Sequence, residues 1–152
     1  PGQWTVGFGG FGEILPNPEN RFVLSAQKDK WGLPVLEFSA DFGQNELQMR
    51  EDMMNEAATM LEAAGFKNIN AYNKQDTHIG LGIHEMGTAR MGTSVKNSIV
   101  NKNNQLHDVK NVFMTDGAVM ASASCVNPSL TYMAMTARAA DFAVNELKKR
   151  NL

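Results

Sequence analysis

The side chain in this sequence that is best suited to acid–base chemistry is a histidine in a glycine-containing segment. His84 opens the segment His-Glu-Met-Gly-Thr-Ala-Arg-Met-Gly, which ends at Gly92. Histidine can exchange a proton near neutral pH because its unperturbed pKa is about 6.5, and Gly87 and Gly92 would let the backbone approach a ligand closely. A polar loop with a structural histidine fits the same residues, so spacing alone leaves both interpretations open.

A second candidate is the junction of Asn127 and Pro128, within the run Ser-Cys-Val-Asn-Pro-Ser-Leu-Thr. Asparagine followed by proline is a common way to begin a helix, with asparagine as the cap and proline as the first helical residue. A helix start also presents unpaired N–H groups and the positive end of the helix dipole, which favour a nearby anion. Capping and ligand binding would each explain the pair.

A third candidate, Asp116 and Gly117, follows residues 109–115, whose composition predicts a strand. Ligands often bind at the carboxyl ends of strands, although an Asp-Gly pair is also an ordinary turn. The literal Gly-x-Gly-x-x-Gly of residues 7–12 is different, because a dinucleotide-binding motif must join a strand to a helix. Two prolines follow within a few residues and would break such a helix, so we reject this motif.

The elements that must position these groups form an α+β pattern, with a mixed or antiparallel sheet and two main helices. In chain order we first expect strands at residues 21–25 and 34–39, joined as a hairpin-like pair by a turn at residues 29–32, which begins with Asp29. We then expect a helix at 44–64 with a left-handed cap at Gly65, a short strand at 66–72, the strand at 109–115, and a final helix that begins at Asn127 and Pro128. Residues 73–98 are expected to be irregular, which is typical of a functional loop or of a segment covered by another part of a protein.

Each helix should bury one apolar face. On the first helix this face comprises Leu47, Met54, Ala57, Ala58, Leu61 and Ala64, with Arg50 interrupting it early. On the final helix it comprises Leu130, Met133, Ala137, Ala140, Ala143, Val144 and Leu147.

The composition argues against several classes of function. Among 152 residues, 16 are acidic and 14 are basic, and no basic patch could neutralise a phosphate backbone, so we expect no nucleic-acid partner. No apolar run is long enough to span a membrane. The single cysteine, Cys125, and three histidines spaced unlike metal ligands argue against a metal site. Because the chain begins with Pro1, we expect its natural N-terminus to be missing.

Taken in order, the three candidate motifs resemble the C-terminal part of the glucose–methanol–choline (GMC) oxidoreductases, which use FAD. The resemblance consists of His-x-x-Gly-Thr-x-x-Met-Gly, a strand ending in Asp-Gly, and Asn-Pro-x-Leu-Thr opening an alanine-rich helix. Residues 11–21 and 29–34 also fit the substrate domain of that family. Each motif is weak by itself, but the ordered set is specific and covers nearly the whole chain.

The resemblance implies a role for each matching residue. His84 matches the active-site base, which takes the hydroxyl proton of an alcohol while a hydride passes to the flavin. Asn127 matches a second active-site position that is histidine in many members; asparagine there is similar to pyranose oxidase, cellobiose dehydrogenase and cholesterol oxidase. An amide can hydrogen-bond a substrate oxygen but cannot act as a base. The positions that match flavin contacts are Asp116, Gly117, Pro128 and Thr131.

We therefore expect residues 1–152 to be the C-terminal, substrate-domain portion of an FAD-dependent oxidoreductase. Its substrate would be the CH–OH group of a sugar or polyol. The family's dinucleotide-binding glycines are absent from this chain, so its partner would be the missing FAD-binding segment of the same protein, and the fragment alone should neither retain FAD nor be active. The alternative is a stand-alone binding module of this fold, without flavin or redox chemistry.

Overall fold

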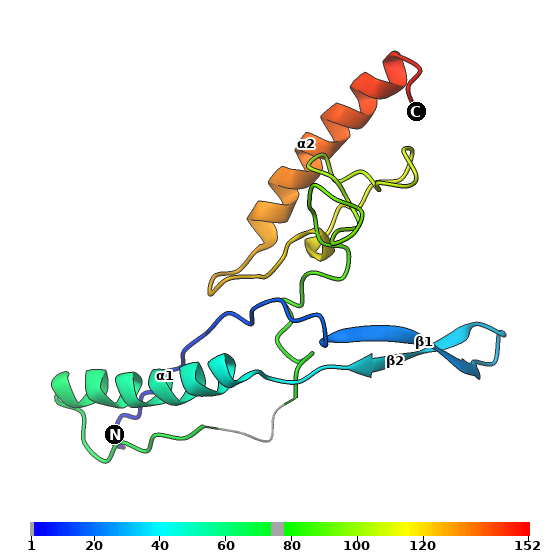
Figure 1. Ribbon diagram of the computed structural model, residues 1–152. Coiled ribbons are helices and arrows are strands. Elements are labelled where there is room, and N and C mark those ends of the chain that lie inside the picture. The colour runs from blue at the N-terminus through cyan, green and yellow to red at the C-terminus, as the bar shows by residue number, and fades with distance from the viewer. Residues whose placement is uncertain (1, 74–77) are drawn as a thin grey trace.

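The structure, a computed structural model, describes residues 2–73 and 78–152. Its elements in chain order are the antiparallel strands β1 (Arg21–Lys28) and β2 (Pro34–Ser39), the helix α1 (Gln44–Ala63), the 3₁₀ turn η1 (Gly117–Val119) and the helix α2 (Ser129–Lys148). The hairpin and α1 lie in one part of the molecule, and α2 lies with the loops around η1 in the other (Figure 1). The predicted α+β class is confirmed.

The hairpin turn is organised by Asp29. Its carboxylate accepts the backbone N–H groups of Trp31 and Leu33, both at 2.9 Å, which is the way aspartate commonly stabilises a tight turn. β2 occupies the predicted residues. β1 extends three residues beyond its predicted end, because Lys28 pairs again with Pro34 after an irregularity in the ladder.

α1 ends in the left-handed cap that the sequence predicts at Gly65, which has a φ of 86°. The N–H of Gly65 donates to the carbonyl of Glu62 at 2.9 Å, and the N–H of Phe66 donates to the carbonyl of Leu61 at 3.1 Å. These bonds satisfy carbonyl groups that the end of a helix would otherwise leave without partners. Phe66 belongs to the cap, and residues 66–72 pair with none of the strands in the described part of the chain, so the prediction of a strand there is wrong.

The apolar face predicted for α1 is correct in its middle and wrong at its ends. Half-buried residues on it are Met54, Ala57, Ala58 and Leu61, and exposed ones are Leu47 and Ala64. Arg50 is also half-buried: its guanidinium lies 5.1 Å from the ring centroid of Phe42, and its Nε donates to Asn73 at 3.1 Å. The arginine therefore belongs to this face.

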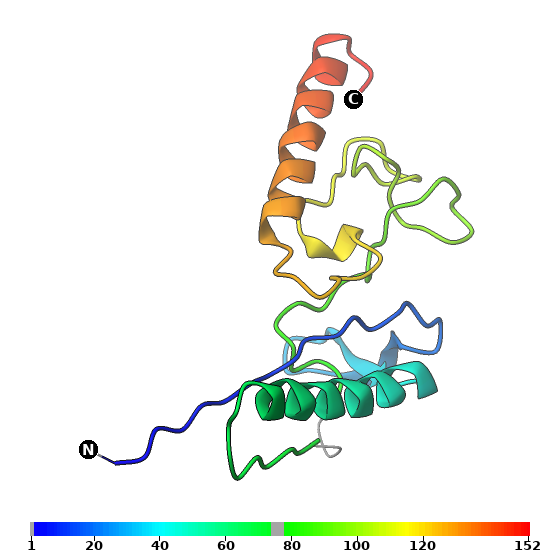
Figure 2. The ribbon, with the colours of Figure 1, turned by 90° about the vertical axis from the view of Figure 1, so that its left-hand side faces the viewer.

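The glycines of residues 7–12 serve packing. This segment forms neither helix nor strand and runs along α1 before it reaches the hairpin (Figure 2). A Cβ on Gly10 would lie 3.0 Å from the sulfur of Met53, and one on Gly12 would lie 2.6 Å from the terminal methyl of Met49. The next element after this segment is the strand β1 and not the helix that a dinucleotide-binding motif would require.

Glu46 ties the start of α1 to the N-terminal segment. It is the buried residue of the helix, with 6% of its surface exposed, and its Oε1 accepts the N–H of Leu15 at 3.3 Å. Burial raises the pKa of the Glu46 carboxyl, but hydrogen bonds from backbone N–H groups, led by that of Leu15, outweigh burial, so the pKa lies below its ordinary value of 4.5.

Changing Glu46 to glutamine should lower the free energy of unfolding by about 1 kcal/mol near pH 7, because the amide keeps an acceptor but loses the charge. A carboxyl whose pKa is lowered by folding stabilises the protein above its unfolded pKa, and this contribution is lost as the pH falls through the folded pKa. Urea unfolding of both proteins should show a difference at neutral pH that shrinks in acid. An equal difference at both pH values would contradict the prediction.

Residues 109–115 do not form the predicted strand. Phe113 makes a single bridge with Gln105, and the N–H of Val112 donates to the carbonyl of Val109 at 3.2 Å inside a turn. The neighbouring backbone at residues 101–105 is itself a tight turn and offers no continuous partner. Residues 73–98 are irregular as predicted where the structure describes them; residues 74–77 lie outside the described residues.

α2 begins one residue later than predicted. Its cap is Pro128, whose carbonyl accepts the N–H groups of Thr131 and Tyr132 at 3.0 and 3.2 Å. Pro128 and not Asn127 is thus the cap, so the prediction that Asn127 is the cap and Pro128 the first helical residue is wrong. Proline holds backbone angles of −90° and −3° here, and these already lead into the helix.

The apolar stripe predicted for α2 is largely uncovered in this chain. Leu130, Met133 and Leu147 are 79%, 62% and 63% exposed, whereas Ala139, which is outside the stripe, is only 1% exposed. The loops around η1 lie against α2 (Figure 2), and Ala139 is the buried residue of that helix. The spacing of apolar residues therefore identified a face but not the surface that would cover it.

The described residues bury few hydrophobic side chains fully, namely Ala89, Val100, Val119 and Ala139. One face of the hairpin is apolar and exposed, with Phe22 paired to Phe38 and Leu24 paired to Leu36. Apolar surface on this scale usually marks an interface. Neither helix of the described part is long and apolar enough to cross a membrane.

Candidate functional site

The His84 loop and the Asp116–Gly117 turn, 24 or more residues apart in sequence, lie side by side. The N–H of Ala89 donates to the carbonyl of Ala118 at 3.0 Å, and the N–H of Met91 donates to that of Val119 at 2.8 Å. Two of the three candidate motifs therefore form one backbone-bonded unit, which α2 covers through its contact with η1.

Two glycines allow this close approach. Gly87 has a φ of 93°, and a Cβ there would lie 3.2 Å from the carbonyl oxygen of Ala121. Gly117 is buried, and a Cβ there would overlap the side chain of Met86. In this chain the absence of a side chain at Gly117 thus leaves space for Met86. This packing alone would require glycine here, whether or not Gly117 also contacts a flavin as predicted.

His84 is half-buried, and its ring makes no hydrogen bond to another described residue. The residue before it, Ile83, has a φ of 70°, which is rare for a β-branched residue because its side chain crowds the backbone there. Glu85 accepts the N–H of Gly82 at 2.7 Å. The imidazole is therefore carried on a strained turn and is free to bond a ligand.

Asp116 behaves as a turn residue. Its Oδ1 accepts the N–H of Ala118 at 2.9 Å and so caps η1. The preceding carbonyl, of Thr115, accepts the hydroxyl of Thr136 on α2 at 2.8 Å. The carboxylate is exposed, and it lies where η1, the preceding loop and α2 meet.

The start of α2 brings Asn127, Pro128 and Thr131 together. Pro128 is buried, whereas Asn127 and Thr131 are exposed. The N–H groups of Ser129 and Leu130 have no acceptor among residues 2–73 and 78–152. This end of the helix therefore presents free donors and the positive end of its dipole.

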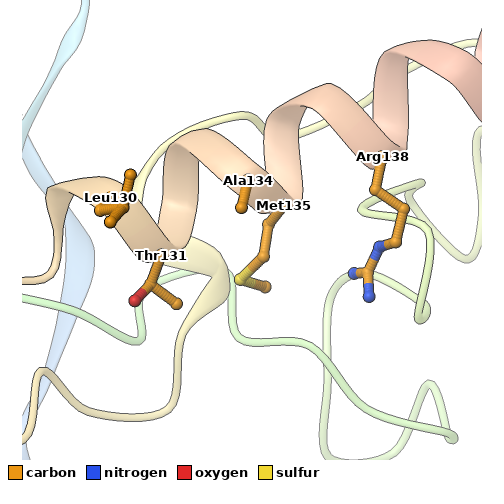
Figure 3. A pocket seen from close by; sticks show the side chains of 5 residues that line it. All are labelled: Leu130, Thr131, Ala134, Met135 and Arg138. Atoms are coloured by element: carbon orange, nitrogen blue, oxygen red, sulfur yellow. The ribbon is translucent and has the colours of Figure 1, made fainter.

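A shallow groove of about 480 Å³, wide open to solvent, lies along α2 from this point. Its walls are Leu130, Thr131, Ala134, Met135 and Arg138, which lie on one side of the helix with the guanidinium at the far end (Figure 3). Thr131 was predicted as a site residue; the others were not. Their three- and four-residue spacing along the predicted helix was the available signal.

The hydrogen bonds of the described residues do not link His84 to Asn127 directly. The loop of His84 and the segment before Asn127 do meet, at Gly87 and Ala121. Within the described part of the chain, no group of three or more histidine, cysteine, aspartate or glutamate side chains could hold a metal ion.

Sequence reasoning missed Asn104, which anchors α2 to the loops. Asn104 is fully buried with a φ of 60°, and its Nδ2 donates to the carbonyl of Met114 at 2.9 Å. Its Oδ1 accepts a hydrogen bond from Arg138 at 3.4 Å. The signal was the run Asn-Lys-Asn-Asn-Gln at residues 101–105, because asparagine tolerates left-handed backbone better than most residues.

A family model described as GMC oxidoreductase matches residues 16–136. The chain belongs to the GMC oxidoreductase family. The resemblance predicted from the sequence is therefore confirmed. That prediction depended on the order of the three motifs and not on any one of them.

Characterised members of the GMC family resemble nearly the whole chain. The chain is 34% identical over 140 residues to the fructose dehydrogenase large subunit of Gluconobacter japonicus, and the aligned residues make up 90% of the chain and 25% of that protein. It is 34% identical over 136 residues to the 2-methyl-1,2-propanediol dehydrogenase of Mycolicibacterium austroafricanum, covering 87% and 24%. It is 25% identical over 132 residues to the pyranose 2-oxidase of Tricholoma matsutake, covering 87% and 23%. The chain thus spans about a quarter of the length of these relatives.

Proposed function

We propose that this chain is the C-terminal catalytic portion of an FAD-dependent GMC oxidoreductase that oxidises a CH–OH group to a carbonyl. The observation that carries the proposal is the junction of the three motifs. The His84 loop is bonded to η1 next to Asp116, and α2, which begins at Ser129 directly after Pro128, packs on η1. Family membership makes redox chemistry on an alcohol the activity best suited to this arrangement.

The start of α2 fits a flavin. The free N–H groups of Ser129 and Leu130 and the helix dipole would favour the negative charge of a reduced ring. Pro128 and Thr131 would lie against the ring, and the apolar wall of the groove beside Thr131 suits a flat heterocycle. Asp116 and Gly117 would approach the ribityl and phosphate part of the cofactor.

Bound FAD would supply the acceptor for the hydride that leaves the alcohol carbon. His84 would take the hydroxyl proton, because its ring makes no hydrogen bond within the described part and is therefore available to a substrate. Asn127 would hydrogen-bond the substrate oxygen and orient it, since an amide cannot accept the proton as a base. His84, not Asn127, would then be the base of the reaction.

The proposed substrate is a sugar or polyol. Among the relatives, the names fructose dehydrogenase, 2-methyl-1,2-propanediol dehydrogenase and pyranose 2-oxidase each denote an enzyme for a polyhydroxylated compound. In this chain, the combination of His84 with an asparagine at position 127 resembles the sugar-oxidising members of the family.

The exposed apolar faces favour this proposal over a stand-alone binding module. Leu130 and Met133 of α2 and the Phe22–Phe38 pair of the hairpin are exposed in this chain. Exposed apolar surface of this extent requires cover in a soluble assembly. An FAD-binding segment of the same protein would provide that cover permanently, whereas an independent module would leave it in water whenever no partner is bound.

Residues 1–152 produced alone should neither retain FAD nor oxidise an alcohol, because the chain holds only the groups on one side of the proposed cofactor. The test is to incubate the chain with excess FAD, remove free FAD by gel filtration and record the visible flavin absorbance. A longer protein that also contains the FAD-binding segment, treated identically, is the control and should be yellow. Stoichiometric flavin on the isolated chain would contradict the prediction.

A further inference from the structure

We propose that Glu13 is a positioning residue for the candidate site: it holds, through Ser122, the segment that leads to Asn127 and Pro128. That this segment belongs to an active site rests on the proposed function, whereas the hydrogen bond between Glu13 and Ser122 and its effect on the segment do not. Glu13 lies in the N-terminal segment, 109 residues away from Ser122 in sequence.

The Glu13–Ser122 contact joins the two parts of the molecule. The hydroxyl of Ser122 donates to a carboxylate oxygen of Glu13, and both residues are half-buried. Every other hydrogen bond that we find between described residues stays within residues 2–73 or within residues 78–152. Among residues 2–73 and 78–152, this bond is therefore the polar contact that fixes one part relative to the other.

Glu13 is fixed on both of its flanks. Gly12 lies against the side chain of Met49 on α1. Two residues after Glu13, the N–H of Leu15 donates to the buried carboxylate of Glu46 at 3.3 Å. The carboxylate thus projects from a backbone that is held to α1, which makes it a suitable anchor for a segment elsewhere.

Ser122 belongs to a segment that touches the His84 loop. The carbonyls of Ala118 and Val119 accept hydrogen bonds from that loop, and the carbonyl of Ala121 lies where a side chain on Gly87 would be. The segment is thereby held by the His84 loop on one side and by Glu13 on the other. Five residues beyond Ser122 the chain reaches Asn127.

This segment needs external support. Ser124, two residues after Ser122, has a φ of 61°, a backbone region that is strained for a residue with a side chain. A strained turn keeps its shape only when surrounding contacts hold it. A hydroxyl bonded to a carboxylate is a strong contact of this kind, and a shift of about 1 Å in a catalytic group can slow a reaction greatly.

The first experiment uses the FAD-loaded protein that contains this chain, with Glu13→Ala, Ser122→Ala, the double variant and Glu13→Gln. In each alanine variant the rate at which an alcohol reduces the flavin, normalised to the amount of bound flavin, should fall roughly tenfold. The double variant should be no slower than either single variant, because all three lose the same bond. Glu13→Gln keeps an acceptor and should stay near wild type. Additive losses, an unchanged rate with only a lowered melting temperature, or a Glu13→Gln rate as low as that of Glu13→Ala would overturn the proposal.

A second measurement separates this proposal from the proposed function. Amide hydrogen exchange should be faster in Glu13→Ala than in the wild type at Ala89, Met91 and Met120, whose N–H groups donate to carbonyls of residues 117–119. Exchange in the β1–β2 hairpin should be unchanged. Unchanged exchange at these amides would overturn the link between Glu13 and Ser122. A wild-type protein that binds no flavin and oxidises no alcohol would instead defeat the proposed function, and with it the role of Glu13 in positioning an active site, even where the exchange result is as expected.

Discussion

Replacing His84 with alanine should slow reduction of the bound flavin by an alcohol by roughly 10²–10⁴-fold, the usual contribution of a general base, while FAD stays bound. The physical reason is that Asn127 cannot take the hydroxyl proton. His84 is half-buried and its ring hydrogen-bonds no described residue, so replacing it leaves no described polar group without its partner. Stopped-flow absorbance of the flavin under anaerobic conditions measures the reduction step by itself.

His107→Ala is the matched control. The Nε2 of His107 lies 2.9 Å from the hydroxyl of Ser98, in a loop that contributes no proposed catalytic group, so this variant should keep the wild-type reduction rate. Equal slowing by both variants would indicate a general loss of structure. A wild-type rate in His84→Ala would remove His84 from the active site.

The elements that the sequence predicted correctly are those specified by local chemistry. Gly65 and its cap end α1 close to the expected residue, and Asp29 organises the expected hairpin turn. Such signals act over four or five residues and need no knowledge of the rest of the fold. The failed strand at residues 109–115 had the right composition but lacked a neighbouring strand, which composition does not reveal.

The candidate site was predictable as a set of motifs, but its geometry was not. Sequence order placed the His84 loop, Asp116 and Asn127 together by resemblance to a family. The bond from Ala89 to Ala118, the place of Met86 against Gly117 and the anchoring by Glu13 depend on contacts between distant residues. The faces of α2 show the same limit, because the spacing of apolar residues marks a stripe on the helix but does not say what would cover it.

Replacing Asn104 with alanine should lower the free energy of unfolding by about 3 kcal/mol. Alanine at a φ of 60° costs roughly 1–2 kcal/mol, and the buried carbonyl of Met114 would lose the Nδ2 donor, for a further loss of about 1–3 kcal/mol. Arg138 of α2 would also lose its acceptor. Thermal unfolding followed by circular dichroism of the FAD-loaded protein measures the change as a lower melting temperature.

Two variants separate the causes of this loss. Asn104→Gly removes the same hydrogen bonds but accepts the left-handed backbone, so it should be less damaging than alanine by the conformational part of the effect. Asn103→Ala changes the neighbouring asparagine, whose side chain makes no hydrogen bond to a described residue, and should be almost neutral. Since Arg138 lines the groove that begins at Thr131, Asn104→Ala should also weaken flavin retention more than Asn103→Ala does. Equal melting temperatures for these two alanine variants would show that Asn104 does not anchor α2.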